Sequence, residues 1–107
     1  MMRIDSDEFF SWLAAHGTDE FVGFPGRYFH SPLANFLSQK AGYVVGEDGK
    51  RYSRANVELY HWLELPRWAQ VFALLSERSF CGRAISAYEA VCVLAEVEAV
   101  VVPALVA

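Results

Sequence analysis

The last eighteen residues of the chain, 90–107, are almost entirely apolar, and this segment constrains the fold more than any other feature of the sequence. Only Glu96, Glu98 and Pro103 interrupt the apolar residues. No uninterrupted apolar run in the segment approaches the roughly 20 residues that a membrane-spanning helix needs, so we expect no membrane partner. The segment must then be covered by the protein's own core or by another protein, because large exposed apolar patches mark interaction sites.

Two structures fit the end of this segment. The valines at 100–102 favour a β-strand, and Pro103 would confine such a strand to a sheet edge or end it. We therefore expect residues 99–107 to form an edge strand on the protein's own core, or a surface that binds a protein partner or a second copy of the chain in a homo-oligomer. The side chains predicted for that interface are Val100, Val101, Val102, Leu105 and Val106.

The composition indicates one compact domain over residues 1–107. Hydrophobic residues make up 54% of the chain, which excludes a disordered chain, because such chains combine low hydrophobicity with high net charge. A length of 107 residues suits a single domain. The formal net charge of −4 disfavours nucleic-acid binding, since that binding depends on neutralising phosphates.

Four helices are predicted from apolar spacing and from signals at their ends. Ser31 followed by Pro32 is typical of a helix start, and Gly42 is typical of a helix end. Ser86 and Glu89 form a capping box before a segment that is apolar nearly all round, and such a helix is typically buried. The predicted helices cover 6–16, 32–41, 66–78, and the residues after Ser86 as far as 97.

The predicted strands lie mostly between the second and third helices. Asp48-Gly49 between β-prone segments is a strong hairpin signal and predicts a hairpin over 43–54. Alternating side chains predict a third strand over 57–62, and a short strand is expected within 20–24. The fold class is therefore α+β, with about four helices packed on a small antiparallel sheet in a single compact domain.

The loop at 23–32 is the first candidate site. It places Arg27, His30 and Ser31 just before a helix N-terminus, where free N–H groups favour an anion such as phosphate or carboxylate. Arg27 could add a bidentate contact to that anion. The alternative is a surface loop fixed by its aromatic side chains, in which Ser31 only caps the helix.

The hairpin arm at 50–54 is the second candidate site. Lys50, Arg51, Tyr52 and Arg54 combine positive charge with an aromatic ring, a pattern that can hold single-stranded nucleic acid. Acidic neighbours dilute this charge. The alternative is cross-strand aromatic pairing with solvated arginines.

Two cysteines are too few for a disulfide scaffold, so we expect Cys81 and Cys92 to be free, buried thiols in a cytoplasmic protein. A thiol hydrolase is a weaker alternative, in which Arg83 would favour the thiolate of Cys81. It needs a base within reach of the thiol, and the sequence places no histidine there. No ligand spacing predicts a metal, and we expect no cofactor and no catalytic residue.

The sequence therefore predicts a small non-enzymatic binding protein that acts through a protein–protein surface, which could be a self-association surface. The alternative is a binder of an anionic ligand or of nucleic acid that uses the 23–32 loop and the 50–54 arm. These two hypotheses differ in where the working surface lies on the fold.

Overall fold

The structure, a computed structural model, describes the backbone of residues 2–55 and 62–106 and the side chains of residues 2–55 and 62–100. Within these residues the chain forms four helices and five strands. In chain order they are α1 (Ser6–Ala14), β1 (Phe21–Gly23), α2 (Pro32–Ala41), β2 (Val45–Glu47), β3 (Arg51–Arg54), β4 (Leu63–Glu64), α3 (Arg67–Phe80), β5 (Ile85–Ser86) and α4 (Ala87–Val106).

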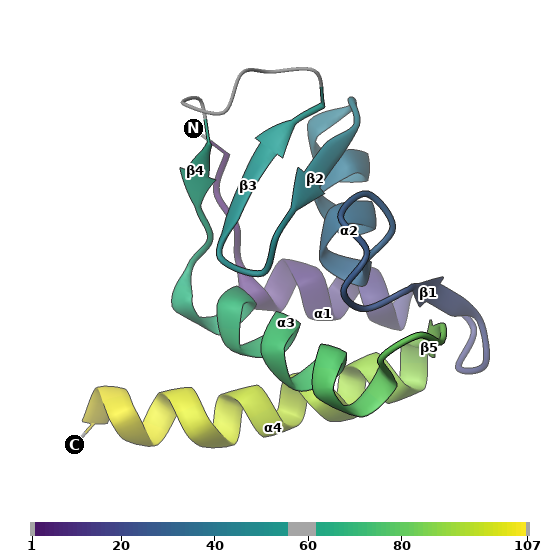
Figure 1. Cartoon of the computed structure of the whole chain (residues 1–107). Helices are drawn as coiled ribbons and strands as arrows, with labels where there is room; N and C mark the ends of the chain where they lie inside the picture. Colours follow the sequence, from purple (N-terminus) through teal and green to yellow (C-terminus); the bar gives the residue numbers. More distant parts are fainter. Residues whose placement is uncertain (1, 56–61, 107) are drawn as a thin grey trace.

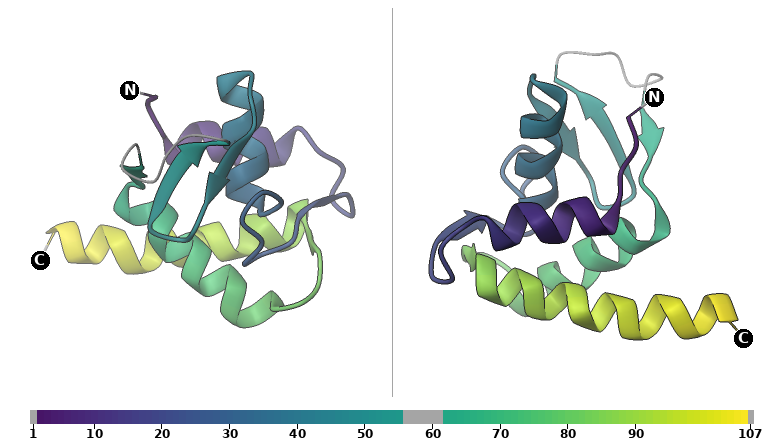
Figure 2. Two further views of the ribbon diagram at one scale, coloured as in Figure 1. Left: turned by 45° about the horizontal axis from the view of Figure 1, so that its top comes forward. Right: turned by 180° about the vertical axis from the view of Figure 1, so that it is seen from behind.

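The predicted α+β class is confirmed, but the strands form two small antiparallel sheets rather than one. β2, β3 and β4 form a three-stranded sheet with β3 in the centre, and β1 pairs with β5. Figure 1 shows the three-stranded sheet at one end of the molecule and α4 at the opposite end, with α1 and α3 between them. The rear view in Figure 2 gives the same order of layers.

The short β1–β5 sheet holds the beginning of α4 in place. Two backbone hydrogen bonds extend this pairing into the helix: the Ala87 N–H donates to the Glu20 carbonyl at 2.8 Å, and the Tyr88 N–H donates to the Thr18 carbonyl at 3.1 Å. The start of α4 is therefore tied to the segment that follows α1.

Phe9 lies at the centre of an aromatic core. Its side chain is fully buried, and its ring centroid lies 4.9 Å from that of Phe72, 5.2 Å from Phe36 and 5.5 Å from Trp68. These rings come from α2 and α3, so Phe9 joins α1 to both helices. Aromatic pairs at such separations add to the stabilisation from burial alone.

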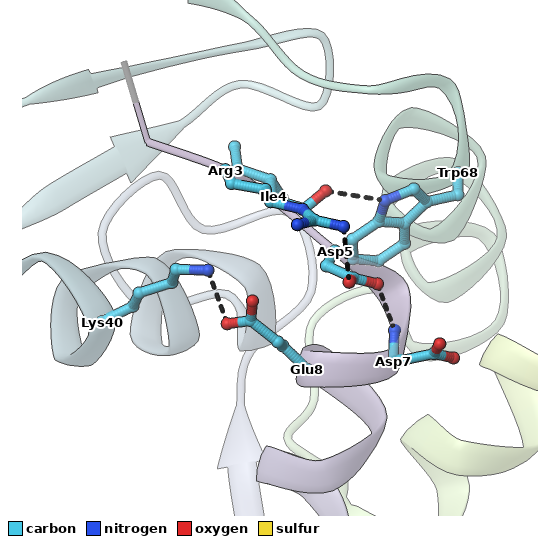
Figure 3. A network of polar contacts seen from close by, with 7 residues as sticks. All are labelled: Arg3, Ile4, Asp5, Asp7, Glu8, Lys40 and Trp68. Atoms are coloured by element: carbon cyan, nitrogen blue, oxygen red, sulfur yellow. Dashed lines mark hydrogen bonds and ion pairs between the residues drawn. The ribbon is translucent and has the colours of Figure 1, made fainter.

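Polar contacts fix the N-terminal segment beside this core, as Figure 3 shows. The indole N–H of Trp68 on α3 donates to the Ile4 carbonyl at 3.3 Å. Lys40 of α2 forms an ion pair with Glu8 of α1. The segment before α1 is thus tied to α3, and α1 is tied to α2.

The predicted helices agree with the structure where end signals are strong. α2 covers 32–41 as predicted; the Ser31 hydroxyl accepts from the Ala34 N–H at 3.0 Å, and Gly42 ends the helix with a φ of 81°. α1 ends two residues before the predicted end, and α3 ends two residues after it. The predicted capping box is confirmed, because the N–H groups of Ser86 and Glu89 each donate to the other side chain.

The edge strand considered for 99–107 is wrong, because α4 continues as a helix to Val106. Once the capping box has started the helix, each added residue forms another backbone hydrogen bond, and this cooperative gain exceeds the local β preference of the valines. The interface considered for the same residues stays a prediction. No helix in the described part of the chain has the length and apolarity needed to cross a membrane.

The sheet also differs from the prediction at its third strand. Residues 57–61 of the predicted strand lie outside the described residues, and Trp62 is not in a strand. The third strand is β4, where Leu63 faces Tyr52 and Glu64 faces Arg51. This strand directly follows the last residue of the predicted one, and it is short, because the chain leaves the sheet at Pro66 to enter α3.

Two burial predictions are wrong. The helix after Ser86 was expected to be buried all round, but only one side of α4 packs on the core, and Tyr88 on the other side is 62% exposed. Cys81 and Cys92 are free as expected, yet both are exposed. Cys81 follows the last residue of α3, and Cys92 lies on the outward side of α4, so the core covers neither thiol.

Candidate functional site

A cavity of about 220 Å³ lies between the loop before α2, the turn of the β2–β3 hairpin and one side of α3. Its charged lining residues are acidic: Glu47 and Asp48 from the hairpin and Glu77 from α3. None of the described residues that line it carries a positive charge. Phe72 and Leu33 supply part of the apolar wall. The cavity thus combines an apolar wall with a negatively charged side.

Glu47 is the buried carboxylate of this cavity, with only 5% of its surface exposed. The Ser31 hydroxyl donates to its Oε1 at 2.6 Å, and the Gly49 N–H donates to its Oε2 at 2.7 Å. Its own backbone N–H donates to the Tyr28 carbonyl at 3.0 Å, which ties β2 to the loop. These bonds hold the carboxylate in place, and none of the described residues forms an ion pair with it.

Tyr28 can pack against the hairpin because residue 46 is glycine. A Cβ atom at Gly46 would lie 2.0 Å from a ring carbon of Tyr28, so any larger residue would displace the ring. The ring also contacts Phe29 and Trp62 at centroid distances of 4.5 and 5.3 Å. Gly46 therefore lets the loop before α2 close over β2 beside Glu47.

Burial raises the pKa of Glu47 above its ordinary value, because the charged form loses hydration. The hydrogen bonds from Ser31 and Gly49 lower this pKa, while the charges of Asp48 and Glu77 raise it further. Burial also raises the pKa of Tyr28, and the two hairpin carboxylates add to that shift. The site therefore favours added positive charge, either as a proton or as a bound cation.

The raised pKa of Glu47 makes stability depend on pH. Between the ordinary value of 4.5 and the raised value, the folded protein holds a proton that the unfolded chain has released. The free energy of unfolding should therefore fall as the pH rises through this range. We expect Glu47→Gln to remove this part of the slope and to raise stability at pH 7. Urea unfolding between pH 4 and 8 measures both effects.

Glu64→Gln is the matched control, because Glu64 is an exposed glutamate of the same sheet. It should leave the slope unchanged. A glutamine at position 47 can accept from the Gly49 N–H and donate to the Ser31 oxygen, so the variant keeps both hydrogen bonds. An unchanged slope in Glu47→Gln would contradict a raised pKa for Glu47.

The predicted anion-binding residues are not brought together. Ser31 lines the cavity, but its hydroxyl binds Glu47, so the protein's own carboxylate lies beside the start of α2. The Arg27 guanidinium lies over the Phe24 ring at 5.1 Å, and His30 is exposed; neither lines this cavity. Anion binding by Arg27 and His30 stays a prediction.

The hairpin arm presents its charges but not its aromatic ring. Tyr52 is only 5% exposed and packs in the core. Arg51 lies 5.5 Å from the Trp62 ring and Arg54 lies 4.4 Å from the Tyr43 ring, while Lys50 is exposed. Arg51 and Arg54 therefore lie over aromatic rings beside the sheet. Nucleic-acid binding by these residues stays a prediction.

The outward side of α4 carries an apolar stripe. Tyr88, Cys92, Ala95 and Ala99 are exposed, and their spacing of four, three and four residues places them along one side of the helix. We call these four residues the α4 stripe. The opposite side of the helix packs on the core through Ala87, Ala90, Val93, Leu94 and Val97.

Of the predicted interface residues, Val100 is described and is 53% exposed on α4. The side chains of Val101, Val102, Leu105 and Val106 lie outside the described part. The thiol hypothesis gains no support, because none of the hydrogen bonds in the described residues joins Cys81 to a histidine. No group of three metal-binding side chains occurs among the described residues.

Sequence reasoning missed Glu47 and Glu77 as site residues. In the sequence, Glu47 next to Asp48-Gly49 has the pattern of a solvated turn. The side chain of Glu47 is buried because the loop before α2, which is distant in sequence, folds over it. The α4 stripe could have been found from its spacing, which the surrounding apolar residues obscured. The chain matches no protein family, no curated protein and no solved structure with which it was compared.

Proposed function

We propose that this protein is a small binding protein that uses the α4 stripe to pair with a helix of a protein partner. The observation that carries this proposal is an apolar stripe left uncovered on a helix of 20 residues whose other side forms part of the core. At 1.5 Å per residue such a helix is about 30 Å long, which gives a partner helix an extended surface.

The spacing of the α4 stripe supports helix pairing. Alternate steps of four and three residues are those of positions a and d in a heptad, the positions that meet between paired helices. Three of its members, Cys92, Ala95 and Ala99, are small, so the backbone of a partner helix can approach closely. Tyr88, at 62% exposed, supplies a larger apolar contact near the anchored end of the helix.

The charges beside the stripe indicate the kind of partner. Glu96 directly follows Ala95 and Glu98 directly precedes Ala99, so the two exposed carboxylates border the stripe on opposite sides. In the heptad these are positions e and g, which determine partner choice through charge. A partner helix with lysine or arginine at its own e and g positions complements them.

A second copy of the chain complements α4 less well. Residues 84–107 contain no lysine, arginine or histidine. Two α4 helices would therefore bring glutamates to glutamates in either direction, and like charges placed opposite one another disfavour the pair. The self-association considered from the sequence is thus the less favoured form of this interaction, and it is an outcome that the experiment can detect.

Two helical peptides test the proposal. Both carry leucine at a and d, and they differ only at e and g, where one has lysine and the other glutamate. We expect the lysine peptide to bind at least tenfold more tightly than the glutamate peptide, a difference of about 1.4 kcal/mol. Added salt should weaken the binding of the lysine peptide, because it screens the charges. Isothermal titration calorimetry measures both affinities, and light scattering measures the oligomeric state of the protein alone.

Reversing the two charges makes the test specific. The double variant Glu96→Lys, Glu98→Lys should prefer the glutamate peptide, because both changed residues are exposed beside the stripe. Glu64→Lys on β4 is the matched control and should keep the preference for the lysine peptide. The proposal of a basic partner helix would be overturned if the two peptides bound equally or if neither bound. A stable dimer of the protein alone would also overturn it.

A further inference from the structure

We propose that the cavity beside Glu47 binds a small organic cation with N–H donors, an alkylammonium or a guanidinium group, whose charge rests against the Glu47 carboxylate. This site is separate from the α4 stripe, since it lies between the loop before α2, the hairpin turn and α3. A ligand here does not depend on the proposed helix partner.

The first support is a buried carboxylate that has no countercharge. Glu47 is 5% exposed, and no ion pair joins it to a cation of the described chain. Burying a charge without a partner is costly, so a cation placed against it recovers part of that cost. Glu77 across the cavity also lacks an ion pair among the described residues, whereas Asp48 is paired with Arg51 at 3.5 Å. Among the described residues, the charges of Glu47 and Glu77 are therefore not neutralised by an ion pair.

The second support is the arrangement of acceptors. Each carboxylate oxygen of Glu47 accepts one hydrogen bond, from Ser31 or from Gly49, and each retains further capacity to accept. The buried Ser76 hydroxyl, which also lines the cavity, donates to the Ala73 carbonyl, so its oxygen can accept from a ligand. A group that carries several N–H donors fits these acceptors, and an anion does not.

The size and the apolar wall limit the rest of the ligand. About 220 Å³ is less than the roughly 300–1,000 Å³ of pockets for drug-sized molecules. Phe72 and Leu33 on the wall favour a short aliphatic stem behind the charged group. A divalent metal ion fits poorly, because Ca²⁺ takes about 6–8 oxygen ligands and no group of three metal-binding side chains occurs among the described residues.

Calorimetric titration at fixed ionic strength with simple probes tests the proposal. We expect butylammonium and butylguanidinium to bind, while butanol, butyrate and Mg²⁺ should not. Glu47→Gln should weaken butylammonium binding at least tenfold, and Glu77→Gln, a change on an exposed side chain, should weaken it a few-fold. Glu64→Gln is the matched control outside the cavity and should bind as the unchanged protein does.

The pH dependence gives an independent reading. Protonating Glu47 removes the attraction, so butylammonium affinity should fall as the pH falls through the pKa of that group, and the fall should be absent in Glu47→Gln. The proposal would be overturned if butylammonium bound both cavity variants as tightly as the unchanged protein, or if neither cation bound. It would also be overturned if butyrate or Mg²⁺ bound more tightly than butylammonium. None of these results depends on whether α4 pairs with a helix.

Discussion

Phe9→Ala lowers the free energy of unfolding by about 3–5 kcal/mol, the range for removing a buried phenylalanine. The side chain is fully buried and lies among the rings of Phe36, Trp68 and Phe72, so its loss leaves a cavity where α1, α2 and α3 meet. Natural domains are stable by only about 5–15 kcal/mol, so the variant loses a large part of its stability. Urea unfolding followed by tryptophan fluorescence measures the loss.

The neighbouring phenylalanine supplies the control for this prediction. Phe10 is 47% exposed on the same helix, so Phe10→Ala makes the same truncation outside the core. Phe10→Ala should change the free energy of unfolding by no more than about 0.5 kcal/mol. Equal losses in the two variants would contradict the position of Phe9 at the centre of the core.

Gly23→Ala is expected to lower the free energy of unfolding by about 3 kcal/mol, the upper end of the range for inserting a group into packed structure. A Cβ atom at residue 23 would lie 2.6 Å from the His30 carbonyl oxygen, 2.6 Å from the Pro32 nitrogen and 2.7 Å from the Ser31 carbonyl carbon. All three are backbone atoms, which cannot rotate away as a side chain would. The start of α2 must therefore move, and with it the Ser31 hydroxyl that binds Glu47.

Gly17→Ala is the matched control, because a Cβ atom there would meet nothing closer than 3.9 Å. It should change stability by less than about 0.5 kcal/mol. Thermal and urea unfolding of the two variants give the comparison. A stable Gly23→Ala protein with unaltered chemical shifts at Ser31 would show that the loop does not close over residue 23 as described.

Local signals in the sequence were enough to locate the helix boundaries that side chains determine. Ser31-Pro32 and Gly42 defined α2, and the Ser86–Glu89 capping box defined the start of α4, because each of these signals acts within a few residues of itself. The end of α4 was missed for the same reason. Helix propagation depends on the residues already in the helix, whereas the strand preference of three valines is a property of those valines alone.

The candidate site could not be predicted, because it is made by contacts distant in sequence. Glu47 is buried because the loop before α2 packs Tyr28 against Gly46. The cavity beside Glu47 is completed by α3, which begins twenty residues later in the chain. Charge counting along the chain placed positive residues near Ser31 and suggested an anion. In the folded protein Ser31 faces Glu47 instead, so the local charge at this point has the opposite sign.

The β1–β5 pairing has a consequence for the order of folding. It joins Gly23 to Ile85, residues more than sixty positions apart, and closing so long a loop costs entropy that only later contacts recover. We expect the hairpin and the single helices to form early and this pairing to form late. The backbone bonds from Ala87 and Tyr88 back to 18–20 belong to the same late step. α4, the helix proposed to bind a partner, therefore takes its place last, after the rest of the domain has formed.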